Sequence, residues 1–170
     1  YPSDEELFNL GFRGLFMNFF VPWKPNDHTD LVIREYGWRP REKGFDRTYR
    51  TMSNLDDMHE NGVHDYLKYI KFGDGRCTDH ASKDIRDGLL SRKEAIERVR
   101  VYDHVKPQDL ERWLDYVDMS IDEFDRIADT FRDPRVWWKD DSGDWEKHNI
   151  WDDRSLRDEK EIRRLQKTDK

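Results

Sequence analysis

Helix-start signals recur in the second half of the chain and constrain its fold more than any other feature. Ser91 precedes Glu94 by three residues and Ser120 precedes Glu123 at the same spacing, so each pair can satisfy first-turn amides as a capping box. Apolar residues follow each start at intervals of three and four. We therefore predict a small lobe of three consecutive helices. They cover residues 92–103, the segment from Pro107, and the segment from 120 to a stop at 133–134.

The most apolar stretch of the chain, residues 11–23, predicts a buried strand. Because a single strand leaves its backbone donors and acceptors unpaired, its partner strands should belong to protein outside this chain. A short helix should follow, capped by Asn26 or Asp27 and ended by Gly37, before an irregular basic loop over residues 38–51.

Helical spacing resumes over residues 56–70, and charge of both signs dominates from Lys139 onward. The predicted fold class is mainly α, with one or two strands left from an incomplete α/β sheet. We expect the end of an α/β domain, then a helical lobe, then a charged, loosely attached tail. These parts cover residues 1–51, 52–138 and 139–170.

The acidic balance of the chain disfavours some classes of partner. Its 31 Lys and Arg residues against 38 Asp and Glu residues give a formal charge of −7, which opposes non-specific binding to nucleic acid or anionic lipid. No apolar segment has the length of a membrane span and no signal peptide is evident, so we expect a cytoplasmic protein. The single cysteine, Cys77, cannot form an internal disulfide. The chain begins at Tyr1 rather than at Met, and we expect it to be a piece of a longer protein.

The densest polar segment, residues 68–88, joins two predicted helices through Gly73-Asp74-Gly75. Glycines let a chain turn sharply and approach a ligand, and the amides of a following helix start favour an anion such as phosphate. The expected substrate- or phosphate-binding residues are Gly73, Gly75, Thr78, Ser82, Lys83 and Arg86. The alternative is a plain glycine-containing turn between helices, with its charges in solvent.

Two further patterns in this segment concern chemistry. Asp79 and His80 could act as a proton-transfer pair. Cys77 and His80 are spaced so that they could place two metal ligands on one helical face, but two ligands do not make a site, and we predict no metal centre. The tryptophans could stack on a sugar or a base, but most of them should pack in a chain that is short of aliphatic residues.

Several strings of the sequence match a known enzyme family. They are Gly11-Phe12-Arg13-Gly14 leading to Val21-Pro22-Trp23, then Arg47-Thr48-Tyr49-Arg50, then KYIKFGDGRCTDHASKDIRDG over residues 68–88 with the following LLSRKEAI, and finally FRDPRVWW with Gly143-Asp144-Trp145. On these strings the chain, over about residues 1–150, resembles the C-terminal part of the N-acetyl sugar amidotransferases. That family belongs to lipopolysaccharide biosynthesis and to the biosynthesis of pseudaminic- or legionaminic-type sugars for flagellin glycosylation.

The resemblance implies a preceding ATP-pyrophosphatase domain with a Rossmann-like sheet, of which residues 1–51 would be the end. Its Ser-Gly-Gly-x-Asp-Ser loop for ATP does not occur in this sequence, so the chain by itself is expected to be inactive. The implied reaction uses ATP and Mg²⁺ to convert the acetamido group of a free or nucleotide-activated sugar into an acetamidino group. Ammonia would come from a glutaminase partner.

Within that reaction, Lys71, Arg76 and Lys83 would stabilise a departing polyanionic fragment, because fixed positive charge favours such a leaving group. Asp79 or His80 would orient ammonia or hold a sugar hydroxyl. The candidate catalytic residues are therefore Arg76, Lys71, Asp79 and His80. The sequence departs from the family at two positions, where Asp74 and Cys77 replace an expected aromatic residue and an expected Ala.

One alternative from another functional class stays open. The helical lobe could be a non-catalytic domain that docks a partner, such as the ammonia-supplying subunit, through its aromatic-rich face. An RNA-binding appendage is a third possibility, which the acidic charge and the lack of a continuous basic stripe disfavour.

Overall fold

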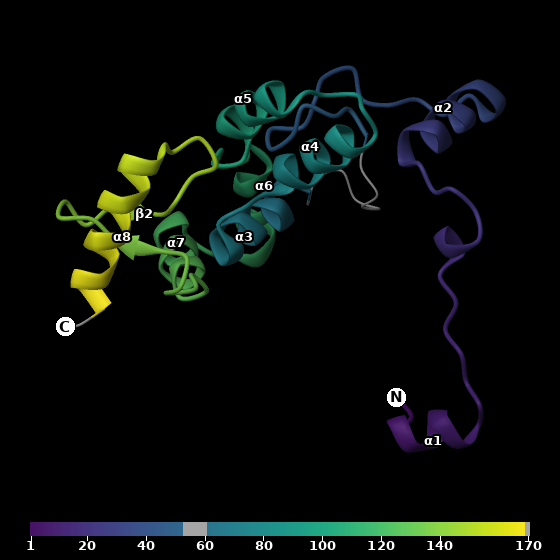
Figure 1. Cartoon of the computed structure of the whole chain (residues 1–170), viewed down its shortest axis with the longest axis horizontal. Helices are drawn as coiled ribbons and strands as arrows, with labels where there is room; N and C mark the ends of the chain where they lie inside the picture. The colour runs from purple at the N-terminus through teal and green to yellow at the C-terminus, as the bar shows by residue number, and fades with distance from the viewer. Residues whose placement is uncertain (53–60, 169–170) are drawn as a thin grey trace. The chain divides into compact units, whose positions relative to one another are not determined.

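The computed structural model describes residues 1–52 and 61–168, and the chain divides into two compact units, residues 1–40 and 41–170. The first unit contains α1 (Asp4–Asn9) and α2 (Pro25–Tyr36) (Figure 1). Pro25 occupies the first turn of α2, where its missing N–H costs nothing, so the helix begins just before the predicted caps. Gly37 ends α2 with a left-handed φ of 67°, which confirms the predicted helix end.

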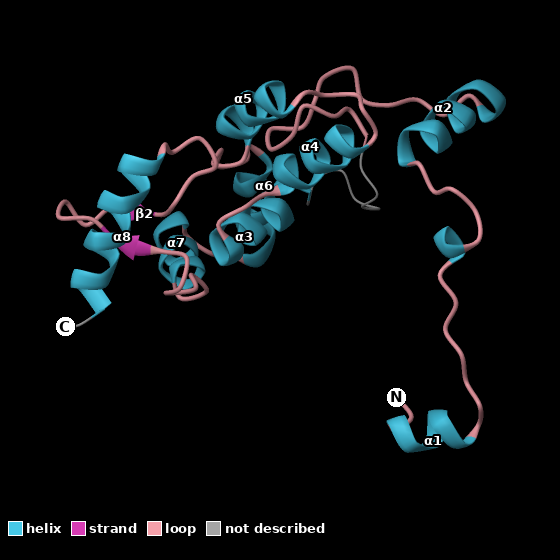
Figure 2. Ribbon diagram, viewed as in Figure 1, coloured by secondary structure: helices cyan, strands magenta, loops and turns pink. Residues whose placement is uncertain are grey.

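Residues 11–23, which we predicted to be a buried strand, form no strand. They run through extended and turn conformations around one short 3₁₀ helix, η1 (Met17–Phe19) (Figure 2). Phe12, Phe16 and Phe20 are exposed. A strand needs a neighbour for its hydrogen bonds, and within the described chain no segment pairs with this one, which is why the prediction is wrong here.

The second unit is built mainly from helices, as the predicted fold class requires. In chain order they are α3 (Asn61–Phe72), α4 (Arg76–Arg86), α5 (Arg92–Tyr102), α6 (Asp109–Val117) and α7 (Ile121–Asp129) (Figure 1). α3 matches most of the helix predicted over residues 56–70, whose first residues lie outside the described part of the chain.

The predicted capping signals start two of these helices. Ser91 and Glu94 form a complete capping box at α5, which confirms the predicted helix within one residue at its end. Ser120 caps α7 by accepting the Glu123 amide at 3.2 Å, but the Glu123 carboxylate pairs with Arg126 and does not complete the predicted capping box. α7 ends at Asp129, before the predicted stop, and α6 begins two residues after Pro107.

Two hydrophobic clusters hold these helices together. The larger joins α3 to α6 and α7 and contains Val63, Ile70, Leu110, Leu114, Phe124 and Ala128. The smaller joins α4 to α5 and contains Cys77, Ala81, Ala95 and Val99. Because three of these four side chains are very small, α4 and α5 can approach each other closely.

The C-terminal residues form a short antiparallel hairpin and a last helix. The hairpin pairs β1 (Trp138–Lys139) with β2 (Trp145–Glu146), and α8 (Arg154–Thr168) follows. A buried ion pair of 2.9 Å joins Lys160, in the middle of α8, to Asp152 in the segment before the helix. The mainly helical fold with two short strands is thus confirmed, although the strands are residues 138–139 and 145–146 and not residues 11–23.

None of the described helices combines the length and the apolar character that crossing a membrane requires.

Candidate functional site

The predicted glycine turn joins α3 to α4, and its two glycines are required by close approaches. Gly73 has a left-handed φ of 76°, and a Cβ on it would lie 2.5 Å from Cγ1 of Val136. A Cβ on Gly75 would lie 2.7 Å from Oδ1 of Asp103. The turn is therefore packed against other segments of the second unit, and larger residues would displace them.

The first turn of α4 already binds an anion, the carboxylate of Asp103 at the end of α5. This carboxylate accepts hydrogen bonds from the Gly75 amide at 2.9 Å, the Thr78 amide at 3.2 Å and the Thr78 hydroxyl at 2.5 Å. A negative charge is favourable at a helix N-terminus, and this buried side chain supplies it from within the chain. A phosphate at Gly73, Gly75 and Thr78 would have to share or replace this contact, and that role stays a prediction.

The remaining predicted binding residues, and the predicted catalytic residue Lys71, lie along α4 or before it. Lys71, Lys83 and Arg86 are exposed, and Ser82 is half-buried. The ammonium of Lys71 lies 5.1 Å from the ring centre of the neighbouring Phe72. None of these four side chains lines the two pockets described below, so the structure does not gather them with the glycine turn.

Arg76 and Asp79 belong to a network of ion pairs between α3 and α4. Arg76 binds the buried carboxylate of Asp65 through Nε at 2.9 Å and through a terminal nitrogen at 2.8 Å. Asp79 contacts Lys68 at 3.0 Å and Arg76 at 3.7 Å. Because Arg76 neutralises a buried carboxylate, replacing Arg76 would lower the stability of the fold in addition to any effect on catalysis.

His80 does not pair with Asp79. Its Nδ1 lies 2.7 Å from the hydroxyl of Thr48, which is buried. Burial, helped by the positive charges of Arg50 and Arg76, lowers the pKa of His80 to about 4. His80 is therefore neutral near pH 7, and the neutral ring can still form a hydrogen bond with Thr48.

The string Arg47-Thr48-Tyr49-Arg50 fastens the preceding loop to the helices. Tyr49 donates its hydroxyl to Asp84 of α4, and Arg50 forms a buried ion pair of 2.5 Å with the same carboxylate. Arg47, only 1% exposed, donates to the backbone carbonyls of Asp103 and Val105.

The guanidinium of Arg47 also lies beside two rings of α3. Its central carbon is 5.1 Å from the ring centre of Tyr66 and 5.5 Å from that of Tyr69. Burial raises the pKa of the Tyr69 hydroxyl to about 12. The phenol therefore stays neutral, and the cation is held by ring faces and carbonyl oxygens.

Cys77 is fully buried between α4 and α5. Burial, followed by the negative charge of Asp103, raises the pKa of its thiol to about 12, so that it stays protonated. In residues 1–52 and 61–168, no group of three His, Cys, Asp or Glu side chains could hold a metal ion.

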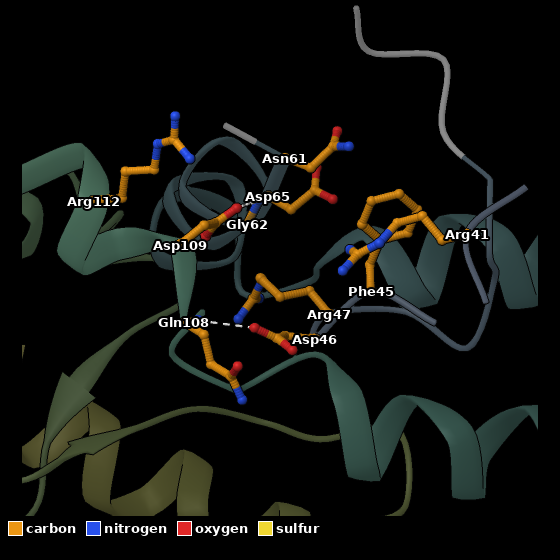
Figure 3. A pocket seen from close by; sticks show the side chains of 10 residues that line it. All are labelled: Arg41, Phe45, Asp46, Arg47, Asn61, Gly62, Asp65, Gln108, Asp109 and Arg112. Carbon is orange, nitrogen blue, oxygen red and sulfur yellow. Dashed lines mark hydrogen bonds between the residues drawn. The ribbon is translucent and has the colours of Figure 1, made fainter. Parts of the chain in front are cut away.

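A polar pocket of about 290 Å³ lies between the loop before Arg47 and the starts of α3 and α6 (Figure 3). Its lining residues are Arg41, Phe45, Asp46, Arg47, Asn61, Gly62, Asp65, Gln108, Asp109 and Arg112. Sequence reasoning missed this pocket, although Arg47 stood in one of the matched strings and Arg41 in the basic loop. The predicted residue Arg76 does not line the pocket, but it binds Asp65, which does.

A smaller pocket of about 100 Å³ lies at the glycine turn. Gly73 and Thr78 line it together with Asp103, Lys147 and Trp151. Burial lowers the pKa of Lys147, whose ammonium donates to the Asn149 side chain at 2.8 Å. The predicted glycine turn is thus closed over by residues that follow the hairpin.

Comparison with known proteins places most of this unit in one family. No curated protein matches the chain. A family model described as "LPS biosynthesis protein WbpG-like, C-terminal domain" matches residues 32–151, a segment that contains the glycine turn and every residue lining either pocket. The chain therefore belongs to the family of WbpG-like C-terminal domains of lipopolysaccharide biosynthesis proteins.

Proposed function

We propose that the chain is the C-terminal part of a cytoplasmic, ATP-dependent N-acetyl sugar amidotransferase of surface-glycan biosynthesis. The overall reaction would convert an acetamido group into an acetamidino group, with ammonia from a glutaminase partner. Family membership supports the setting in lipopolysaccharide biosynthesis, and the matched strings support the reaction type. The observation that carries the proposal is the charged pocket of Figure 3, which lies within the family segment.

The described residues do not form a site that fits ATP and Mg²⁺. The first-turn amides of α4 bind Asp103, and no described cluster suits a metal ion. We therefore propose that ATP and Mg²⁺ are held by an ATP-pyrophosphatase domain of the complete enzyme, while this chain holds the acceptor sugar. Arg76 would then act by fixing Asp65 at the edge of the pocket.

The test is an assay of the complete enzyme with ATP, glutamine, its glutaminase and N-acetyl sugars. We expect AMP, pyrophosphate and a product in which NH replaces the amide oxygen, detected by mass spectrometry. The Arg76→Gln variant should lower product formation while the glutaminase still co-purifies. The exposed Arg92, at the start of α5, offers the matched control variant Arg92→Gln, which should behave as the wild type. Failure to form an acetamidino product from any N-acetyl sugar would contradict the proposal.

A second candidate, a non-catalytic docking domain, is favoured by one observation in the first unit. Phe8, Phe16 and Phe19 are each more than four-fifths exposed, and they lie in or beside the apolar stretch of residues 11–23. An exposed apolar surface of this kind is typical of a site that binds another protein. Under this alternative, the glutaminase would bind the chain, and the Arg76→Gln variant would leave turnover unchanged.

A further inference from the structure

The pocket of Figure 3 contains three carboxylates, each of which already has a hydrogen-bond or ion-pair partner within the chain. Asp46 accepts the Gln108 amide at 2.8 Å, and Asp109 accepts the Gly62 amide at 2.8 Å (Figure 3). Asp65 is paired with Arg76 at 2.8 Å. These internal donors reduce the attraction that the three carboxylates would exert on an external cation.

Among the described residues, the three arginines that line the pocket have fewer charged partners than the carboxylates. Arg41 and Arg112 are exposed on opposite sides of the pocket, and neither forms an ion pair within residues 1–52 and 61–168 (Figure 3). Arg47 is buried, and its Nε has no hydrogen-bond partner among those residues. Guanidinium groups bind carboxylate and phosphate oxygens in paired hydrogen bonds, so the pocket is suited to an oxyanion.

The size and the remaining lining residues of the pocket restrict the class of ligand that it could bind. A volume of about 290 Å³ lies just below the roughly 300–1,000 Å³ usual for ligand sites, which suits one ring rather than a whole nucleotide. Gln108 supplies an amide for hydroxyl groups, and Phe45 supplies a ring. The central carbon of the Arg41 guanidinium lies 4.6 Å from the centre of that ring. A Cβ on Gly62 would lie 2.0 Å from Oδ1 of Asp109, so only glycine leaves this wall intact.

We propose that this pocket binds a single sugar ring that carries an oxyanion, a carboxylate or a phosphate, and that Arg41 and Arg112 hold the oxyanion. Arg47 and Asp65 form the polar wall beside the ring, and Arg76 positions Asp65. The biological setting of the proposal rests on the proposed function, whereas its test is a binding measurement that requires no turnover.

The test is titration of the 170-residue chain with four probes, followed by calorimetry and by NMR of the protein amides. The probes are glucuronate, N-acetylglucosamine 6-phosphate, N-acetylglucosamine and inorganic phosphate. We expect one or both charged sugars to bind at least about tenfold more tightly than the neutral sugar and than phosphate alone. Comparison of the first two probes distinguishes a carboxylate from a phosphate ligand.

Arg41→Gln and Arg112→Gln should each weaken the charged sugar about tenfold or more, because each removes a charge-assisted contact. Both side chains are exposed, so the variants should fold, which circular dichroism verifies. Arg126→Gln is the matched control, because Arg126 lies on α7, is 76% exposed and does not line the pocket. Its affinity should equal that of the wild type.

Unchanged affinity in both Arg41→Gln and Arg112→Gln would overturn the proposal, as would equal binding of phosphate alone, which indicates an adventitious ion site. Failure of both charged sugars to bind, while the complete enzyme still forms an acetamidino product, would reject this pocket and leave the proposed function standing. Binding that depends on both arginines, without any acetamidino product, would support the pocket and reject the proposed function.

Discussion

His80 is held neutral by burial and by neighbouring cations, and this makes stability depend on pH. A histidine whose pKa is lowered on folding binds fewer protons in the folded state, so its contribution is complete above its ordinary pKa of 6.5 and is lost as the pH falls toward about 4. We expect this residue to account for about 3 kcal/mol of lost unfolding free energy across that range. Urea unfolding at a series of pH values measures it.

The His80→Gln variant isolates this effect, because glutamine can keep a hydrogen bond to Thr48 but does not titrate. Its stability should fall less steeply than that of the wild type between pH 6.5 and 4. A slope equal to the wild-type slope would show that His80 is not the titrating group.

Cys77 provides a second test at the scale of one residue. Its thiol is 0% exposed and its pKa is raised to about 12, so almost no thiolate forms at pH 8. Iodoacetamide should therefore leave the folded chain unmodified and should modify it rapidly in urea, as mass spectrometry would report. Rapid modification of the folded chain would contradict the packing of α4 on α5.

At the scale of elements, α4 depends on a cap that comes from α5. Asp103→Ala removes the acceptor of two amides and one hydroxyl in a buried position, which should lower the unfolding free energy by about 2–4 kcal/mol. Asp87→Ala, at the exposed end of α4, is the control and should change it by less than about 0.5 kcal/mol. Equal effects of the two substitutions would show that the cap is unimportant.

Local signals predicted elements well where the cause of the element is itself local. Ser91 and Glu94 start α5 through contacts three residues apart, and Gly37 ends α2 through its own backbone conformation. Residues 11–23 failed as a strand because a strand is stabilised by a neighbour, which local sequence does not supply.

The candidate site was harder to predict for the same physical reason. Asp103 caps a helix that begins 27 residues earlier in the chain, and Asp46 meets Gln108 across 62 residues. No spacing rule connects such residues, because folding alone brings them together. The glycine turn was predicted from its local pattern, whereas the anion that fills it and the pocket of Figure 3 were not.

At the scale of the whole molecule, the two units should differ in their resistance to protease. The helices of residues 1–40 contain no buried residue, whereas the unit over residues 41–170 has two hydrophobic clusters. Local unfolding that exposes the backbone to a protease therefore costs less in the first unit. Brief digestion with chymotrypsin should cut among Phe12, Phe16 and Phe20 before it cuts within residues 61–168.

Mass spectrometry of the fragments over time checks that order. First cuts inside α3 to α7 would contradict it, since these helices carry the larger cluster and the smaller one.

Arg47 lines the larger pocket and also contacts Asp103, which lines the smaller one, so ligand binding in the larger pocket should affect the stability of the fold. It lines the larger pocket, while its guanidinium holds the backbone of Asp103, whose carboxylate holds the first turn of α4. A ligand that contacts Arg47 should therefore stabilise the same contacts that hold α4 against α5. By mass action, any true occupant of the larger pocket should raise the melting temperature of the second unit in proportion to the logarithm of its concentration above Kd.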